Sequence, residues 1–134
     1  MPRGNEPYES ADIRIGEVVW SKTMQGADAI KQQEHLAELA EMAETGVILD
    51  CAFVEVANSE LLNLLVRVRT LAKKTKKGFA LFNVPENLTS TINTCNLAAI
   101  LPIASDMVEA KKLVYGVVHG QGGLTATLKR FLKG

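Results

Sequence analysis

Three features of the 134-residue chain predict an α/β fold with a mixed, largely parallel sheet. Short apolar runs alternate with segments of helical period, and the connections between them are short. The length suits one domain, and a 47% share of hydrophobic residues suffices for a single core. We therefore expect four to five strands with helices packed mainly on one face, and an amphipathic helix at the C-terminus.

The N-terminal third is expected to hold a loose arm, a strand and a helix. Residues 1–11 are polar, and residues 13–20 predict one strand or a tight hairpin bent at Gly16. A helical period starts at Gly26, and Gly46 suits the left-handed position that ends a helix. The apolar face of this helix comprises Ala29, Leu36, Leu39, Ala40 and Ala43.

The middle of the chain predicts a buried strand, a long helix and a second strand. Residues 47–51 form a short apolar run bounded by turn signals, and residues 79–82 form another. Between them we expect a helix at about residues 60–76, which Gly78 ends. Its inner stripe comprises Leu61, Leu65, Val68 and Ala72, with Leu62 and Val66 widening the stripe toward the surface.

The last third predicts two more helices around a short strand. A helix starts at Pro85 and runs to about Cys95, residues 100–103 form the strand, and Ser105 caps the next helix. The domain proper is expected to span residues 12–115. Residues 116–134 then comprise a glycine-rich link at 116–123 and a terminal amphipathic helix with Leu124, Leu128 and Phe131 at helical spacing.

The charge balance and the lack of targeting signals limit the classes of partner. The formal net charge is +0, which gives no electrostatic reason to expect nucleic acid. No apolar run approaches the roughly 20 residues of a membrane span, and the N-terminus does not look like a signal peptide. We therefore expect a cytoplasmic protein in which Cys51 and Cys95 are reduced and lie in apolar surroundings.

The residues that carry chemistry do not form a catalytic or metal-binding pattern. His35 and His119 are far apart and lack partners at ligand spacing. The chain also lacks a CxxC pair and a nucleophile elbow, and GQGG at 120–123 does not fit a phosphate-binding loop. We expect no metal, no cofactor and no enzymatic activity.

One polar pair, Asn58-Ser59, opens the leucine-rich helix eight residues after Asp50. Asn and Ser are preferred N-cap residues, so capping alone could explain both. The alternative is that Ser59 is a phosphorylation site. A phosphate at a helix N-terminus faces the positive end of the helix dipole and changes the local surface charge by about −2.

In their order and spacing, several motifs of this chain resemble those of the STAS domain, the fold of bacterial anti-sigma factor antagonists. That family shows a strand ending in Asp, then Asp-Ser-Ser-Gly-Leu, a later Asn-x-Pro turn, and a Leu-x-x-x-Leu-Pro-Ile segment before an acidic helix. This chain has LDCAFVEVANSELL, FALFNVPENL and LAAILPIASDMVEA at matching intervals. The resemblance covers roughly residues 12–114.

The resemblance implies a regulatory domain that works by partner switching and takes part in transcription signalling. Ser59 falls at the phosphoacceptor serine of the family, while Asn58, Glu60 and Leu61 replace the neighbouring Asp, Ser and Gly. The implied partner is an anti-sigma factor or a serine kinase of the histidine-kinase-like ATPase type. The expected partner surface comprises Asn58, Ser59, Glu60, Leu61, Leu62, Val66, Val84, Pro85, Glu86 and Asn87.

Two alternatives keep the fold but change the function. In the first, the domain is a scaffold or assembly module without a phosphorylation switch, in which Ser59 only caps its helix and the C-terminal helix packs on its own core or on a second copy in a homodimer. In the second, the domain binds a small ligand, a nucleotide or a lipid, at the helix N-terminus around Ser59.

Overall fold

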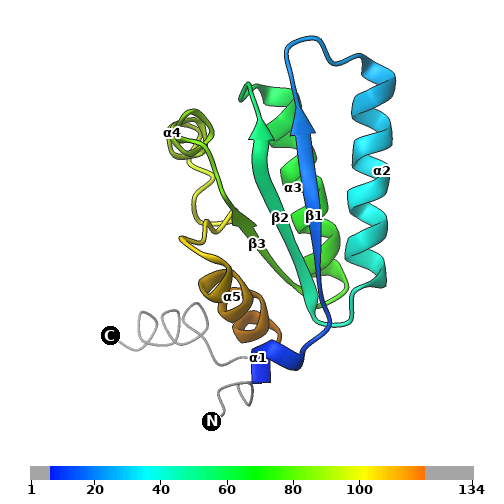
Figure 1. Ribbon diagram of the computed structural model, residues 1–134, viewed down its shortest axis with the longest axis vertical. Coiled ribbons are helices and arrows are strands. Elements are labelled where there is room, and N and C mark those ends of the chain that lie inside the picture. The colour runs from blue at the N-terminus through cyan, green and yellow to red at the C-terminus, as the bar shows by residue number, and fades with distance from the viewer. Residues whose placement is uncertain (1–6, 120–134) are drawn as a thin grey trace.

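The computed structural model describes residues 7–119, which fold around a three-stranded parallel sheet of order β1-β2-β3 (Figure 1). The strands are β1 (Ile13–Trp20), β2 (Gly46–Val54) and β3 (Gly78–Phe82). The helices are α1 (Pro7–Ser10), α2 (Gly26–Met42), α3 (Ser59–Lys74), α4 (Glu86–Thr94) and α5 (Met107–His119). The α/β class is confirmed, and Ile13–Trp20 is one strand rather than a hairpin.

The sheet is smaller than the expected four to five strands, and within residues 7–119 it is parallel rather than mixed. The segment expected as a strand at 100–103 forms a single bridge, between Ile103 and Leu81. The amide of Leu81 donates to the carbonyl of Pro102, and the carbonyl of Leu81 accepts from Ala104. Because Pro102 has no amide proton, it cannot extend this pairing into a strand.

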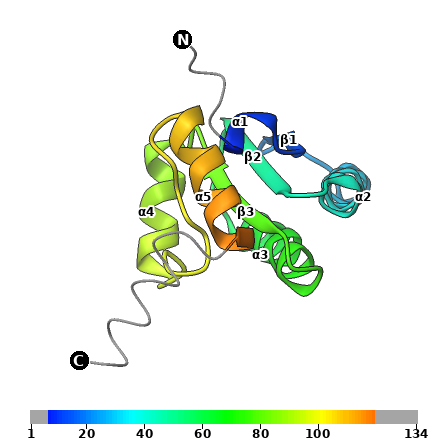
Figure 2. The ribbon, with the colours of Figure 1, turned by 90° about the horizontal axis from the view of Figure 1, so that it is seen from below.

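Helices lie on both faces of the sheet (Figure 2). Each face packs against its own hydrophobic core, and the two cores differ in size. The larger core lies between the sheet and α2 and α3, and α4 adds Leu88 and Ile92 to it. The expected inner stripe of α3 is confirmed, since Leu61, Leu65 and Val68 are fully buried. The smaller core lies on the opposite face, where α5 covers Ile48 and Ala80.

Gly46 allows close packing of a helix on the sheet and does not end a helix. α2 ends at Met42, and Gly46 is the first residue of β2. A Cβ atom on Gly78, the register partner of Gly46, would fall 2.7 Å from the Cα of Val114 in α5. The two glycines therefore let α5 approach the sheet, so the expected left-handed role of Gly46 is wrong.

Two helix ends differ by a residue or two from those expected. The left-handed residue after α3 is Lys76, with φ 61°, while the amide of Lys77 donates to the carbonyl of Ala72, as in a Schellman motif. The N-cap before α5 is Asp106, whose carboxylate accepts from the amide of Glu109 at 2.8 Å, and not Ser105. The side chain of Lys77 joins the ends of two helices, because its Nζ donates to the carbonyls of Ala40 and Glu41 at the end of α2.

Helix α5 continues through Gly116 to His119, so the first four residues of the expected link at 116–123 are helical. The arm expected at 1–11 includes the single turn α1. The expected C-terminal helix lies outside the described residues.

A β-bulge between β1 and β2 changes which side chains face outward. Glu17 pairs with Asp50, but the next pair joins Val19 to Phe53, so β2 has one more residue than β1 over this interval. As a result Val54 returns to the core while Phe53 turns away from it.

Candidate functional site

The two segments expected to form a partner surface lie together at the carboxyl edge of the sheet. The loop after β2 and the loop after β3 leave the same edge because the strands are parallel. The Nδ2 of Asn83 donates to the carboxylate of Asp50 at 3.1 Å, and the Nδ2 of Asn87 donates to the carbonyl of Glu55 at 3.2 Å. These bonds join β2 and the loop that leads to α3 with the loop after β3 and the first turn of α4.

Asn58 is the residue that organises the start of α3. Its Oδ1 accepts from the amide of Leu61 at 2.9 Å, which caps the helix. The same oxygen accepts from the indole Nε1 of Trp20 at 3.2 Å. Trp20 is only 3% exposed at the end of β1, so Asn58 links the helix start to the buried end of the first strand.

Ser59 is the first residue of α3 and lies on the surface. Its hydroxyl has no hydrogen-bond partner among residues 7–119, because Asn58 already provides the cap. The hypothesis that Ser59 caps the helix is therefore wrong. A hydroxyl that is exposed and not needed for capping is available for modification.

The ten residues of the expected partner surface divide into three groups by exposure. Two of them, Leu61 and Leu62, are 0% and 7% exposed, so they belong to the core and not to the surface. Both lie in the first turn of α3, where the helical period points them at the sheet. The exposed group comprises Asn58, Ser59, Glu60, Glu86 and Asn87, and the half-buried group comprises Val66, Val84 and Pro85.

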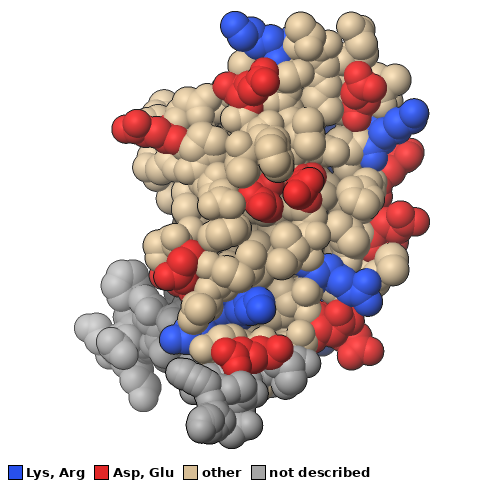
Figure 3. Space-filling view, viewed as in Figure 1, with Lys and Arg blue, Asp and Glu red and all other residues tan. Residues whose placement is uncertain are grey.

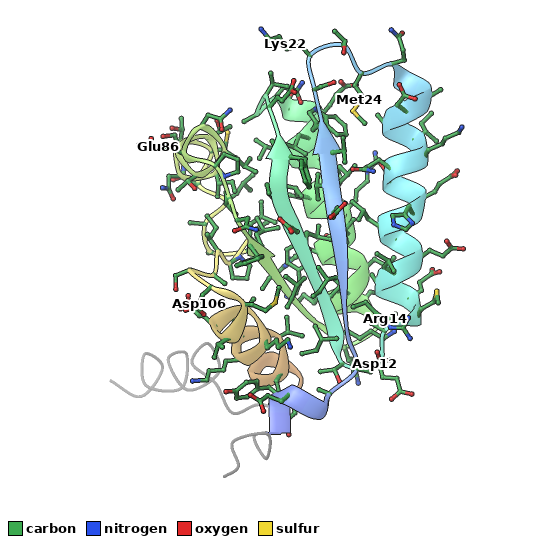
Figure 4. The ribbon with its side chains drawn as sticks, viewed as in Figure 1. Asp12, Arg14, Lys22, Met24, Glu86 and Asp106 are labelled. Atoms are coloured by element: carbon green, nitrogen blue, oxygen red, sulfur yellow. The ribbon has the colours of Figure 1, made fainter. Side chains whose placement is uncertain are left out.

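The sequence interpretation missed the part of the site that β1 and its following loop contribute. A small hollow of about 110 Å³ separates this loop from the start of α3, and Trp20, Met24, Asn58 and Glu60 are among its lining residues. Met24 turns inward beneath the loop, whereas Lys22 points out from its tip (Figure 4). The single tryptophan at the end of a predicted strand was the one signal in the sequence that this loop belongs to the site. No local sequence pattern connects Trp20 with Asn58, 38 residues later.

The thiol that lies beneath the site is poorly suited to nucleophilic attack. Cys51, which carries this thiol, is 0% exposed, and burial, with a smaller contribution from the charge of Asp50, raises the pKa of the thiol to about 12. A thiol with that pKa stays protonated at neutral pH and is a poor nucleophile. Cys95 is exposed, contrary to the expectation of apolar surroundings.

Residues 7–119 contain neither a metal-binding cluster nor a helix suited to cross a membrane. No cluster of three or more His, Cys, Asp or Glu side chains in this range could hold a metal ion. None of the helices in the same range combines the length and the apolar character that crossing a membrane requires.

No protein-family model matches the chain, and no curated protein sequence matches it.

Proposed function

We propose that the chain is a non-enzymatic regulatory domain of the STAS type, which acts by binding a protein partner at the carboxyl edge of its sheet. Its resemblance to anti-sigma factor antagonists suggests an anti-sigma factor or a serine kinase of the histidine-kinase-like ATPase type as the partner. Phosphorylation of Ser59 is the proposed switch. The observation that carries the proposal is the exposed Ser59 hydroxyl next to the true cap, Asn58.

A phosphate on Ser59 would change the surface without unfolding the helix. It would stand at the positive end of the α3 dipole, where an anion is stabilised by about 0.3–1 kcal/mol. The exposed carboxylates of Glu60 and Glu86 already make this edge acidic. An added charge of about −2 would therefore oppose a partner that docks through acidic or apolar groups.

The test is incubation with a serine kinase of the stated type from the same organism, followed by mass spectrometry of the intact protein and its peptides. We expect one phosphate, on Ser59. The Ser59→Ala variant should remain unmodified, whereas Ser90→Ala, which changes an exposed serine of α4, should be modified as the wild type is.

Binding of the partner is measured separately by calorimetry with unmodified and phosphorylated protein. We expect phosphorylation to weaken binding at least about tenfold, equivalent to about 1.4 kcal/mol. If such kinases neither modify Ser59 nor bind the protein, the proposal is wrong. Binding without modification would instead favour the scaffold alternative.

The geometry gives little support to the small-ligand alternative at this site. Ligand pockets usually enclose about 300–1,000 Å³, whereas the hollow beside Asn58 holds about 110 Å³. The carboxylate of Glu60 in its lining also opposes the phosphate groups of a nucleotide.

A further inference from the structure

The outer face of β1 and β2 exposes large apolar side chains in an ordered array. Ile15, Val19 and Phe53 are 46%, 48% and 55% exposed. The strand register places Val19 beside Phe53 and Glu17 beside Asp50. We call these five residues the open face. Figure 3 shows acidic groups in the middle of this side of the molecule, surrounded by a largely uncharged surface.

Parallel sheets are normally covered on both faces, so this array is unusual. Helix α5 lies over β3 and the start of β2, and half-buried Ile13 at the start of β1 packs against the same core. The rest of β1 and of β2 is left uncovered on this face (Figures 1 and 2). A shallow hollow of about 480 Å³ lies on this face, lined by Ile15, Glu17, Val19, Gln32, His35 and Asp50. The open face therefore has the shape and the apolar groups of a docking surface.

Strand addition at the edge of β1 is not the use that the structure favours. Helix α2 runs along that edge, and the side chain of Gln32 accepts a hydrogen bond from the amide of Val19. A symmetric dimer through the open face is also disfavoured, because it would bring Glu17 and Asp50 of both copies together.

We propose that the open face binds the C-terminal segment of the same chain, residues 124–133. The chemistry of the segment matches: Leu124, Leu128 and Phe131 repeat at helical spacing, so one side of a helix would be apolar. Residues 120–134 also contain Lys129, Arg130 and Lys133 and no acidic residue. Apolar groups would pack on Ile15, Val19 and Phe53 while the cations approach Glu17 and Asp50.

The length of the segment fits the open face. Val114 packs on Gly46 and Gly78 at the starts of their strands, so α5 ends, at His119, near that end of the sheet. Five residue steps from His119 to Leu124 reach up to about 17 Å. The register pairs Ile13 with Gly46, so Ile15 lies two residues, roughly 7 Å, along β1 from that end of the sheet. Ten helical residues then extend about 15 Å, close to the roughly 13 Å between Ile15 and Val19 along β1.

Disulfide trapping in the full-length protein tests the proposal. In a Cys95→Ser background, one variant carries Val19→Cys with Leu132→Cys and a second carries Ile15→Cys with Thr125→Cys. The control carries Thr70→Cys, an exposed position on α3 on the other side of the sheet, with Leu132→Cys. We expect both test pairs to form an intramolecular disulfide on the order of tenfold faster than the control pair, because docking raises the effective concentration.

Charge reversal provides the second measurement. Glu17→Lys should slow trapping of the Val19–Leu132 pair several-fold, whereas Glu38→Lys, at an exposed position on α2, should not. Equal rates for test and control pairs would overturn the proposal, and so would disulfide-linked dimers, which would assign the segment to a second copy. Circular dichroism checks that each variant is folded, and the second pair remains decisive if one variant is not. Neither the trapping rates nor the effect of charge reversal depends on Ser59, so this test is independent of the proposed function.

Discussion

At the scale of single residues, the start of α3 shows how neighbours with similar chemistry take different roles. Asn58 and Ser59 are both good capping residues, yet the oxygen of Asn58 makes the cap and the bond to Trp20. Ser59 is thereby left with an exposed hydroxyl. Asn58 therefore has the structural role, and Ser59 has the proposed regulatory role.

Alanine substitutions at these two positions should have unequal effects on stability. Asn58→Ala removes the cap, which costs about 0.5–2 kcal/mol, and leaves the Nε1 of buried Trp20 without its acceptor. Ser59→Ala should change the free energy of unfolding by less than about 0.5 kcal/mol. Urea unfolding of both variants measures the difference. A larger loss for Ser59→Ala would restore the capping role to the serine.

Local sequence alone could not decide between such neighbours. Asn58 precedes Ser59 just as Ser105 precedes Asp106, yet the asparagine caps in the first pair and the aspartate in the second. Which residue of each pair becomes the N-cap depends on where the preceding strand or bridge positions the backbone. The inner stripes of α2 and α3 were predictable because burial follows the helical period, and this physical signal is local.

At the scale of elements, the packing of α5 on the sheet depends on two residues without side chains. Gly46 and Gly78 lie opposite Val114 in the contact between β2, β3 and α5. The sequence offered no signal for this role, since glycine after a helix is equally typical of a helix end. Likewise the bulge that turns Phe53 outward arises from the pairing of distant strands.

A methyl group at Gly78 should loosen this contact. Gly78→Ala places a Cβ against the backbone of Val114, which cannot move aside as a side chain can. We expect a loss of about 1–3 kcal/mol in the free energy of unfolding. Gly26→Ala is the matched control, because a Cβ there meets nothing within 4 Å. Unfolding curves that coincide for the two variants would show that α5 adjusts without cost.

The start of α5 should make stability depend on pH in the acid range. Hydrogen bonds from the amide of Ser105, at 2.6 Å, and from its hydroxyl, at 2.8 Å, lower the pKa of Glu109 below its ordinary value of 4.5. Between the pKa of Glu109 in the folded protein and its pKa in the unfolded chain, the unfolded chain binds more protons than the folded protein. The free energy of unfolding therefore rises with pH in this range. The contribution is fully present above pH 4.5 and is lost as the pH falls through the folded-state pKa.

Urea unfolding across the acid range checks this assignment. Glu109→Gln cannot ionise, so its free energy of unfolding should fall less steeply on acidification than that of the wild type. Ser105→Ala keeps one of the two donors, the amide, and should give an intermediate slope. Parallel curves for all three proteins would show that Glu109 is not the titrating group.

At the scale of the whole molecule, the two cysteines report on different states of the fold. Cys51 is fully buried in the larger core with its pKa raised to about 12, while Cys95 is exposed after α4. In native protein a thiol reagent should modify Cys95 alone, and in denaturant both. Counting modified thiols by mass spectrometry provides the measurement, with Cys95→Ser as the control. Reaction of Cys51 at the rate of Cys95 would contradict its burial.

The bond between Trp20 and Asn58 also has an optical consequence. Trp20 is the single tryptophan of the chain, and its indole N–H donates to the oxygen that caps α3. Indole fluorescence responds to the polarity and hydrogen bonding around that N–H. The protein therefore carries a natural fluorophore that is hydrogen-bonded to Asn58, the residue before its proposed switch. Phosphorylation or partner docking at Ser59 would then register as a change in emission without any added label.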